Sequence, residues 1–205
     1  MTADAAPPIV LASGSPRRRE LLGALGVPFE VDAPNVDETT GEVDPVRVAE
    51  GLAIRKARAG GAAHPDALVI GSDTVVHLAG RLLGKPADPH EAREMLQALR
   101  GRTHEVVTGV ALVLGARLIA SHGRTAVQMR DYSDAEIEAF IASGSPFDKA
   151  GGYAIQDPAF APVARFEGCE CNVVGLPLGE LRRLLAVFDI PTQVPAVSCR
   201  ACSEL

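Results

Sequence analysis

Near its N-terminus the chain carries hydroxyl, glycine and arginine residues in an order that suits anion binding. The apolar segment 9–12 leads into Ser-Gly-Ser-Pro at residues 13–16 and then into Arg17, Arg18 and Arg19. Proline is favoured in the first turn of a helix, whose free N–H groups and positive dipole end attract phosphate, and arginine can bind phosphate with two parallel hydrogen bonds. The same residues would also form an ordinary strand, serine cap and helix with solvated arginines. The segment matches neither the dinucleotide-binding glycine pattern nor the P-loop.

Acidic residues at two places in the chain could bind a divalent cation. Asp37 and Glu38 lie in a turn-rich stretch, and Asp73 lies beside a glycine where one strand is expected to end and another to begin. Carboxylates on such turns suit hard divalent cations, which take oxygen ligands and keep several waters. They would otherwise be solvated turn residues. Lys56, expected at a helix end, and Lys85 are surface lysines unless the fold brings them to these carboxylates.

A later segment combines two adjacent glycines, Gly151 and Gly152, with Lys149, Tyr153 and Gln156. Glycines allow a backbone to approach a ligand closely. The Gln156 amide offers a paired donor and acceptor, which can read the edge of a nucleic base. This segment therefore predicts part of a binding site.

The spacing of the residues does not indicate a histidine metal site, a histidine base or a serine nucleophile. The five histidines show no H-x-x-H or H-E-x-x-H pattern, so a histidine zinc site is not expected. His104 is expected to order a turn before a strand rather than to act as a base. There is no G-x-S-x-G nucleophile elbow, and neither Ser13 nor Ser15 has a base partner in the sequence.

Four cysteines fall late in the chain, as Cys169-x-Cys171 and Cys199-x-x-Cys202. Each spacing can place two sulfurs on one tetrahedral ion, so a four-thiolate zinc site is one interpretation. The interpretation we favour is four free thiols, with the second pair on a tail beyond the last clear core helix, where chains tend to fray. A structural disulfide is less expected in a cytosolic protein.

Composition indicates a globular protein with a small anionic ligand. The 205 residues are 47% hydrophobic and 22% charged, which is enough for one domain with a buried core. No apolar run is long enough for a membrane helix, and residues 1–8 lack the features of a secretory signal, so we expect a cytoplasmic protein. The net charge of −6 and a pI near 5.4 oppose binding to nucleic acid.

Turn and cap signals divide the chain into alternating helices and strands. Helices are expected at about 17–25, 45–59, 89–99, 134–143 and 178–188, with Gly60-Gly61 as the stop of the second. Strands are expected at about 9–12, 29–31, 67–70, 74–78, 81–83, 105–114 and 117–130. Because hairpins and crossovers are mixed, the pattern favours a mixed α/β fold, with a mixed sheet flanked by helices. We expect one domain over 1–190 and a C-terminal tail, with scope for flexibility, over 191–205.

Together these segments resemble the Maf proteins, also called septum formation proteins, which are nucleoside triphosphate pyrophosphatases with an inosine-triphosphatase-like fold. The matching motifs cover most of the chain in order: Leu11–Arg18, Lys56–Ala59, Gly71–Val76, Gly84–Pro86, Asp148–Gln156 and Asn172–Leu178. The resemblance implies an elongated, curved mixed sheet with helices in two lobes and the nucleotide in the cleft between them.

The resemblance also implies a role for individual residues. Asp73 matches the general base of the family, and Arg17 matches its arginine on the triphosphate side. Thr74 and Gln156 match positions tied to base selection. The remaining phosphate-site positions match Ser13, Ser15, Arg18, Lys56 and Lys85.

The implied chemistry is hydrolysis assisted by a divalent cation. Mg²⁺ or Mn²⁺ held by Asp73 with Asp37 or Glu38 would lower the pKa of a bound water and neutralise charge. Asp73 would orient or deprotonate the water for attack at the α-phosphorus, releasing pyrophosphate and a nucleoside monophosphate. Arg17 and the other cations would stabilise the leaving pyrophosphate.

The late motif resembles the branch of the family that acts on dTTP and UTP, and we expect these or modified pyrimidine triphosphates as substrates. The chain departs from the family pattern at Asp37, Gly152 and Asp157, and 7-methyl-GTP is the alternative substrate. A nucleotide-binding regulator of cell division without turnover would use the same residues. The expected partner is a small nucleoside triphosphate, not nucleic acid or a membrane, and a homodimer stays an option.

Overall fold

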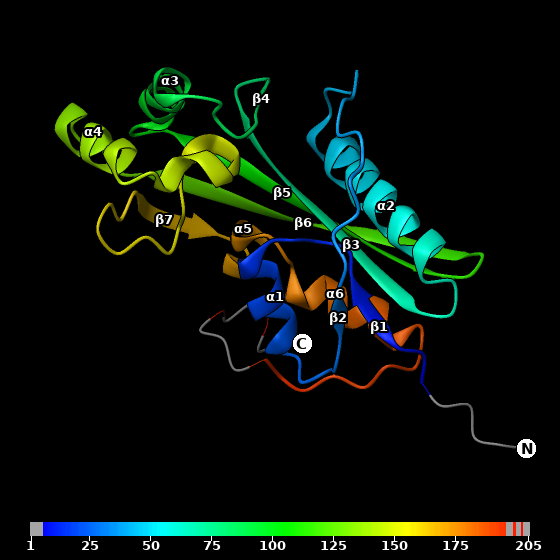
Figure 1. Cartoon of the computed structure of the whole chain (residues 1–205). Helices are drawn as coiled ribbons and strands as arrows, with labels where there is room; N and C mark the ends of the chain where they lie inside the picture. The colour runs from blue at the N-terminus through cyan, green and yellow to red at the C-terminus, as the bar shows by residue number, and fades with distance from the viewer. Residues whose placement is uncertain (1–5, 196–198, 200–201, 203–205) are drawn as a thin grey trace, which may run out of the picture.

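A seven-stranded mixed sheet forms the centre of the molecule (Figure 1). The computed structural model describes residues 6–195, 199 and 202. Along the sheet the order is β2 (Glu30–Val31), β1 (Ile9–Leu11), β3 (Leu68–Leu78), β5 (Thr103–Leu114), β6 (Arg117–Met129) and β7 (Val163–Glu167), and β4 (Arg81–Leu83) pairs with the far end of β3. β1 is parallel to β2 and β3, and the other pairs are antiparallel. The prediction of a mixed sheet flanked by helices is confirmed.

Two separate apolar cores cover the two ends of the long strands. One core packs α1 (Pro16–Gly23) and α6 (Leu178–Ala186) against β1 and the neighbouring strand ends. The other packs α3 (Pro89–Leu99) and α4 (Asp134–Ala142) against the opposite ends of β3, β5 and β6. Figure 1 shows α3 and α4 together at one end of the sheet, away from α1 and α6. This arrangement gives the molecule two lobes joined by continuous strands.

The strand β3 runs without a break through Gly71 and Asp73, so the predicted turn at this point is wrong. Glycine is required here for a different reason, because α2 (Pro45–Ala63) lies directly on the strand. A side-chain carbon added at Gly71 would lie 2.2 Å from the Ala53 carbonyl oxygen, and one at Gly109 would lie 2.3 Å from that of Ala49. The two glycines therefore let the helix approach β3 and β5 closely, and they carry no turn.

The helix α2 also continues past its predicted stop at Gly60-Gly61 and ends at Ala63. A side-chain carbon at Gly60 would lie 2.8 Å from Val69 Cγ1, and one at Gly61 would lie 3.0 Å from Val113 Cγ1. These glycines again make room for the sheet. As a result Lys56 lies inside the helix, one turn or more from either end, and not at a helix end as predicted.

The predicted helix starts are confirmed by their caps. Ser15, Asp44, Asp88 and Ser133 each accept a hydrogen bond from the backbone three residues further on, and Ser133 forms a full capping box with Glu136. Proline follows the first three caps, where its missing N–H has no cost. The predictions from local signals are therefore confirmed where a cap or a hairpin turn fixes the end of a helix or strand.

Three shorter elements complete the fold: η1 (Ser145–Asp148), η2 (Ala150–Gly152) and α5 (Glu170–Val174). His104 lies within β5, and the prediction that it orders a turn is wrong. None of the helices in the described part of the chain is long and apolar enough to span a membrane. In the predicted tail, the Gln193 N–H donates to the Leu25 carbonyl, and Cys199 and Cys202 are buried. Residues 196–198, 200–201 and 203–205 of that tail lie outside the described residues.

Candidate active site

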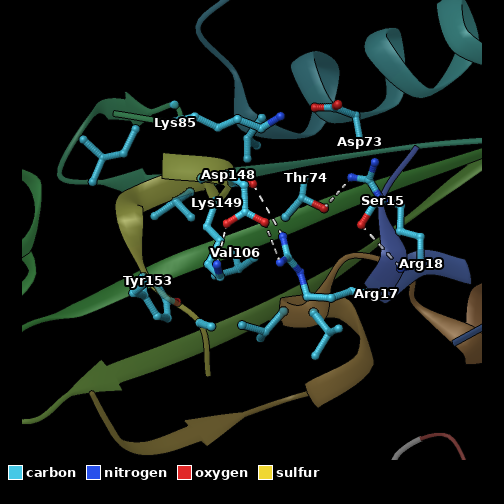
Figure 2. Close-up of a pocket in the computed structure, with 18 of the residues that line it drawn as sticks. Ser15, Arg17, Arg18, Asp73, Thr74, Lys85, Val106, Asp148, Lys149 and Tyr153 are labelled. Carbon is cyan, nitrogen blue, oxygen red and sulfur yellow. Dashed lines mark hydrogen bonds and ion pairs between the residues drawn. The ribbon is translucent and has the colours of Figure 1, made fainter. Parts of the chain in front are cut away.

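A pocket of about 420 Å³ opens on the middle of the sheet, and both lobes contribute to it. Charged and hydroxyl side chains line one part of it, and aliphatic side chains line the rest. Figure 2 shows the polar residues of α1 and β3 facing those of η1 and the segment after β4. The polar lining comprises Ser15, Arg17, Arg18, Glu38, Lys56, Asp73, Thr74, Lys85, Asp148, Lys149 and Gln156. Such a pocket can take a ligand with an anionic part and a flat apolar part.

Two carboxylates converge on one buried ammonium group in this pocket. Lys56 Nζ lies 2.5 Å from Asp73 Oδ1 and 2.7 Å from Glu38 Oε1. The side chains of Lys56 and Asp73 are only 12% and 11% exposed. Burial raises the pKa of Glu38, but the hydrogen bond and the charge of Lys56 outweigh it, so the pKa lies below its ordinary value. Glu38 is therefore ionised at neutral pH, and its carboxylate and that of Asp73 direct oxygens at a single point.

Of the two residues predicted to share a cation with Asp73, only Glu38 faces it. Asp37 is turned away: its carboxylate accepts a hydrogen bond from the Thr39 N–H at 2.8 Å, and it does not line the pocket. Hydrogen bonds from the Thr39 side chain and then from its backbone hold the pKa of the exposed Asp37 carboxyl below its ordinary value. The sequence left the choice between Asp37 and Glu38 open, and the geometry favours Glu38.

Arg18 is held by three hydrogen bonds beneath the polar part of the pocket. Its guanidinium donates to the Gly175 carbonyl at 2.8 Å, to Thr74 Oγ1 at 3.1 Å and to Ser13 Oγ at 3.2 Å. Burial lowers the pKa of this guanidinium, and the charge of Asp73 opposes the shift. Ser13 is buried and is not part of the lining, so it contacts Arg18 from behind. Ser13 thus positions Arg18, whereas Ser15 reaches the pocket itself.

Arg17 extends across the pocket to the other lobe. Its Nη1 lies 3.0 Å from Asp148 Oδ2, and Lys149 contacts the other oxygen of the same carboxylate (Figure 2). Burial raises the pKa of Asp148, but its bonds to Lys149 and Arg17 outweigh this and lower it. The sequence had marked Lys149 but missed Asp148 as its partner. The only signal was that Asp148 begins the late motif.

Thr74 and Gln156, the two residues that the family resemblance ties to base selection, differ in how firmly the protein holds their side chains. Thr74 Oγ1 is bonded to Arg18 and lies 3.0 Å from Thr108 Oγ1, so its orientation is set by the protein. Gln156 lines the pocket, and within the described residues its side-chain amide has no hydrogen-bond partner. Gln156 is therefore available to a ligand, and Thr74 is held in place beside it.

Behind the pocket wall, His104 supports Tyr153, which lines the cavity. His104 Nε2 lies 2.6 Å from the Tyr153 hydroxyl, and both side chains are buried. Burial lowers the pKa of His104 to about 4, so the imidazole is neutral at pH 7. Sequence reasoning missed the contact of His104 with Tyr153 across 49 residues.

Comparison with known proteins gives a consistent result along nearly the whole chain. A family model described as "Maf-like protein" matches residues 8–188. The dTTP/UTP pyrophosphatase of Thermomicrobium roseum is 52% identical over 91% of this chain and 87% of its own length. The dTTP/UTP pyrophosphatases of Symbiobacterium thermophilum and Deinococcus radiodurans are 47% and 49% identical over 89% and 90% of this chain, and over 95% of their own length. Among solved structures, the Ham1 protein of Staphylococcus aureus is 17% identical with a TM-score of 0.46 over 60% of this chain and 72% of its own.

Proposed function

The chain belongs to the Maf family, and we propose that it is a pyrophosphatase that converts dTTP and UTP into the nucleoside monophosphate and pyrophosphate. The observation that carries this proposal is the position of Asp73. Its carboxylate lies inside a pocket with basic side chains on both lobes and an apolar part large enough for a base. The names of the relatives supply the substrates, and the geometry supplies a physical route to the reaction.

The donor set of the pocket fits a divalent cation such as Mg²⁺ or Mn²⁺. Asp73 and Glu38 already direct oxygens at one positive charge, the Lys56 ammonium, at 2.5 and 2.7 Å. Carboxylate oxygens are the ligands that both cations prefer. We assign Asp73 and Glu38 as the residues that hold the cation. When bound, it would neutralise phosphate charge and make water more acidic.

Asp73 is placed to accept a proton from the attacking water. Lys56 bonds to Oδ1, and the described residues give the other carboxylate oxygen no hydrogen-bond partner. The water oxygen forms a bond to the α-phosphorus while the bond from that phosphorus to the bridging oxygen breaks. The proton passes to Asp73, and pyrophosphate leaves with the bridging oxygen.

The basic side chains around the pocket stabilise the charge that builds up on the leaving pyrophosphate. Arg17 and Lys149 hold Asp148 between them, and a triphosphate offers both cations a stronger anion in its place. Lys85 lines the same pocket. Ser15 caps the N-terminus of α1 and lines the same pocket, so the helix dipole adds to the positive potential there.

The base would lie in the apolar part of the pocket within reach of Gln156. The lining there includes Val106, Tyr153 and Ile155. An amide presents one donor and one acceptor, which matches the imide edge of uracil or thymine. With the amide held in that orientation, cytosine, which has an amino group in place of one carbonyl, would leave a group unpaired, at a cost of about 1–3 kcal/mol.

A product assay with a panel of nucleoside triphosphates tests this function. We expect pyrophosphate and the monophosphate as first products, with dTTP and UTP at the top of the kcat/KM order. Orthophosphate as the first product would overturn the reaction. A best rate with 7-methyl-GTP would overturn the substrate class, and tight binding with no turnover of any triphosphate would instead indicate a regulator.

A further inference from the structure

The four cysteines, which the catalytic pocket does not use, meet at one point of the fold. Cys169 caps α5 and Cys171 lies in its first turn, while Cys199 and Cys202 come from the C-terminal segment about 30 residues later. Cys169 Sγ lies 3.4 Å from Cys199 Sγ and 3.2 Å from Cys202 Sγ, and all four sulfurs lie within 4.8 Å of one another. The expectation of a second pair standing apart on a tail is therefore wrong.

These separations, 3.2 and 3.4 Å for two pairs and within 4.8 Å for all, are close to the edge length of a thiolate tetrahedron around a single ion. Four sulfurs at the usual zinc–sulfur distance of about 2.3 Å stand about 3.8 Å from each other. A disulfide would bring two sulfurs to about 2.05 Å, whereas Cys169 Sγ stands 3.4 Å from Cys199 Sγ and 3.2 Å from Cys202 Sγ. The space between them admits one ion and is too small to enclose an iron–sulfur cluster.

The surroundings also suit a closed metal site. Cys171, Cys199 and Cys202 are buried within the apolar core that contains α1 and α6. A zinc ion with four thiolates carries two net negative charges, and the Arg182 guanidinium approaches the site by donating to the Cys202 carbonyl at 3.5 Å. Because protein sulfurs fill all four positions, no place is left for a reactive water.

We propose that Cys169, Cys171, Cys199 and Cys202 bind one Zn²⁺ ion, which fastens the C-terminal segment to α5. The ion is structural and separate from the divalent cation of the oxygen-lined pocket. Binding replaces the thiol protons with the metal, so protons are released as the site fills.

The cysteine site is also connected to the active site by hydrogen bonds. The Cys171 carbonyl accepts hydrogen bonds from Gly175 and Leu176 at 3.0 and 2.9 Å, which shapes the end of α5. The Gly175 carbonyl in turn accepts from Arg18 at 2.8 Å and from Ser72 at 3.0 Å. Zinc would therefore stabilise the turn against which Arg18 is positioned, while taking no part in the reaction.

Metal analysis of the full chain tests the proposal. The wild-type protein, purified with reductant and without added metal or chelator, should contain about one zinc per chain. Replacing the metal with Co²⁺ should give the intense visible bands of a tetrahedral cobalt–thiolate complex. Iron in place of zinc, a disulfide between any of the cysteines, or no metal even after refolding with Zn²⁺ would each overturn it.

A double variant with a matched control locates the ion. Cys199→Ser with Cys202→Ser should lose the zinc and the cobalt bands. Gln193→Ala is the control, because it alters the same segment without removing a thiol and leaves the backbone hydrogen bond from Gln193 to Leu25 in place. This variant should keep the zinc and the cobalt bands. Zinc retained by the double variant would show that the ion binds elsewhere.

Thermal unfolding of the wild type gives a second test that needs no variant to fold. With Mg²⁺ kept in the buffer, a zinc-selective chelator should lower the melting temperature, and added Zn²⁺ should restore it. A melting temperature that does not respond to the chelator would contradict a structural role.

Discussion

The two sides of the pocket are built in different ways. On the inner wall, formed by α1, β3 and the end of α5, Arg18 makes three hydrogen bonds and Asp73 is nearly buried. On the outer wall, formed by η1, η2, the residues that follow η2 and the segment after β4, the Asp148 side chain is 62% exposed, and the Gln156 amide has no hydrogen-bond partner among the described residues. The inner wall is therefore held in place by its own hydrogen bonds, while the outer wall presents groups that are exposed or lack a partner among the described residues.

The rigidity of the inner wall comes from polar groups that are buried and satisfied. Asn172 donates to the Val106 carbonyl and to Thr125, and it accepts from the Thr108 N–H, so it ties α5 to β5 and β6. Breaking such a network leaves unpaired groups away from water, which is costly. Reaction chemistry placed on this wall should tolerate little change, and recognition on the outer wall should be easier to alter.

The largest effect is expected at Asp73, the proposed general base on the inner wall. Asp73→Asn removes the proton acceptor and should lower kcat by about a hundredfold or more, as is typical for a general base. Steady-state pyrophosphate release measures it. Asp66→Asn, at an exposed carboxylate outside the pocket, is the matched control and should leave kcat unchanged. A kcat within a few-fold of wild type would remove Asp73 from the chemistry.

Arg17 connects the two walls, and removing it should have the second largest effect on catalysis. Arg17→Ala removes the cation that exchanges Asp148 for the triphosphate, and kcat/KM should fall by about 2 kcal/mol, roughly thirtyfold. Arg19→Ala removes an exposed arginine two residues along the same helix and should have a much smaller effect. Equal losses at Arg17 and Arg19 would mean that general positive charge, rather than a specific contact, explains the cluster.

His104 supports the outer wall through Tyr153 and should make stability depend on pH. Its pKa is about 4 in the folded protein, below the ordinary 6.5, so the unfolded chain takes up a proton first as pH falls. The contribution of neutral His104 to the free energy of unfolding is complete above about pH 6.5 and is lost as the pH falls toward 4. About 2 kcal/mol of it is lost between pH 7 and 5. Urea unfolding at these two pH values should show that His104→Gln removes this part of the loss. An unchanged difference between the two pH values would contradict the assignment.

Gln156 should show the smallest effect, confined to the choice of base. We expect wild-type kcat/KM for dTTP and UTP to exceed that for CTP by about tenfold, and Gln156→Ala should narrow the gap. The neighbouring Asp157 carboxylate is occupied by the Ala159 and Phe160 N–H groups, so Asp157→Asn serves as the control. If Gln156→Ala keeps the full preference for dTTP and UTP over CTP, another residue selects the base.

The sequence predicted the elements whose causes are local. Caps and hairpin glycines act within a few residues, so α3, α4 and the β5–β6 pair lie close to their expected bounds. The turn predicted at Gly71 and the helix end predicted at Gly60 were wrong, because glycine also occurs where a helix lies directly on a sheet. The sequence alone does not distinguish a glycine in such a contact from a glycine in a turn.

The site was predictable where the family motifs name a residue and not where contacts join distant segments. Asp73, Lys56 and Thr74 follow from the resemblance, and all three line the pocket. The pairing of Arg17 with Asp148 spans 131 residues, and the meeting of the four cysteines was one of two interpretations that the sequence left open. The fold decides such cases, because spacing along the chain does not say which distant segments meet.

The most direct test of the account is the fate of the water oxygen. Hydrolysis of dTTP in water enriched in oxygen-18, followed by mass spectrometry of both products, reports which phosphorus is attacked. Attack at the α-phosphorus, as the position of Asp73 and the cations predicts, places the label in dTMP and leaves the pyrophosphate unlabelled. Label in the pyrophosphate, with unlabelled dTMP, would contradict the proposed reaction.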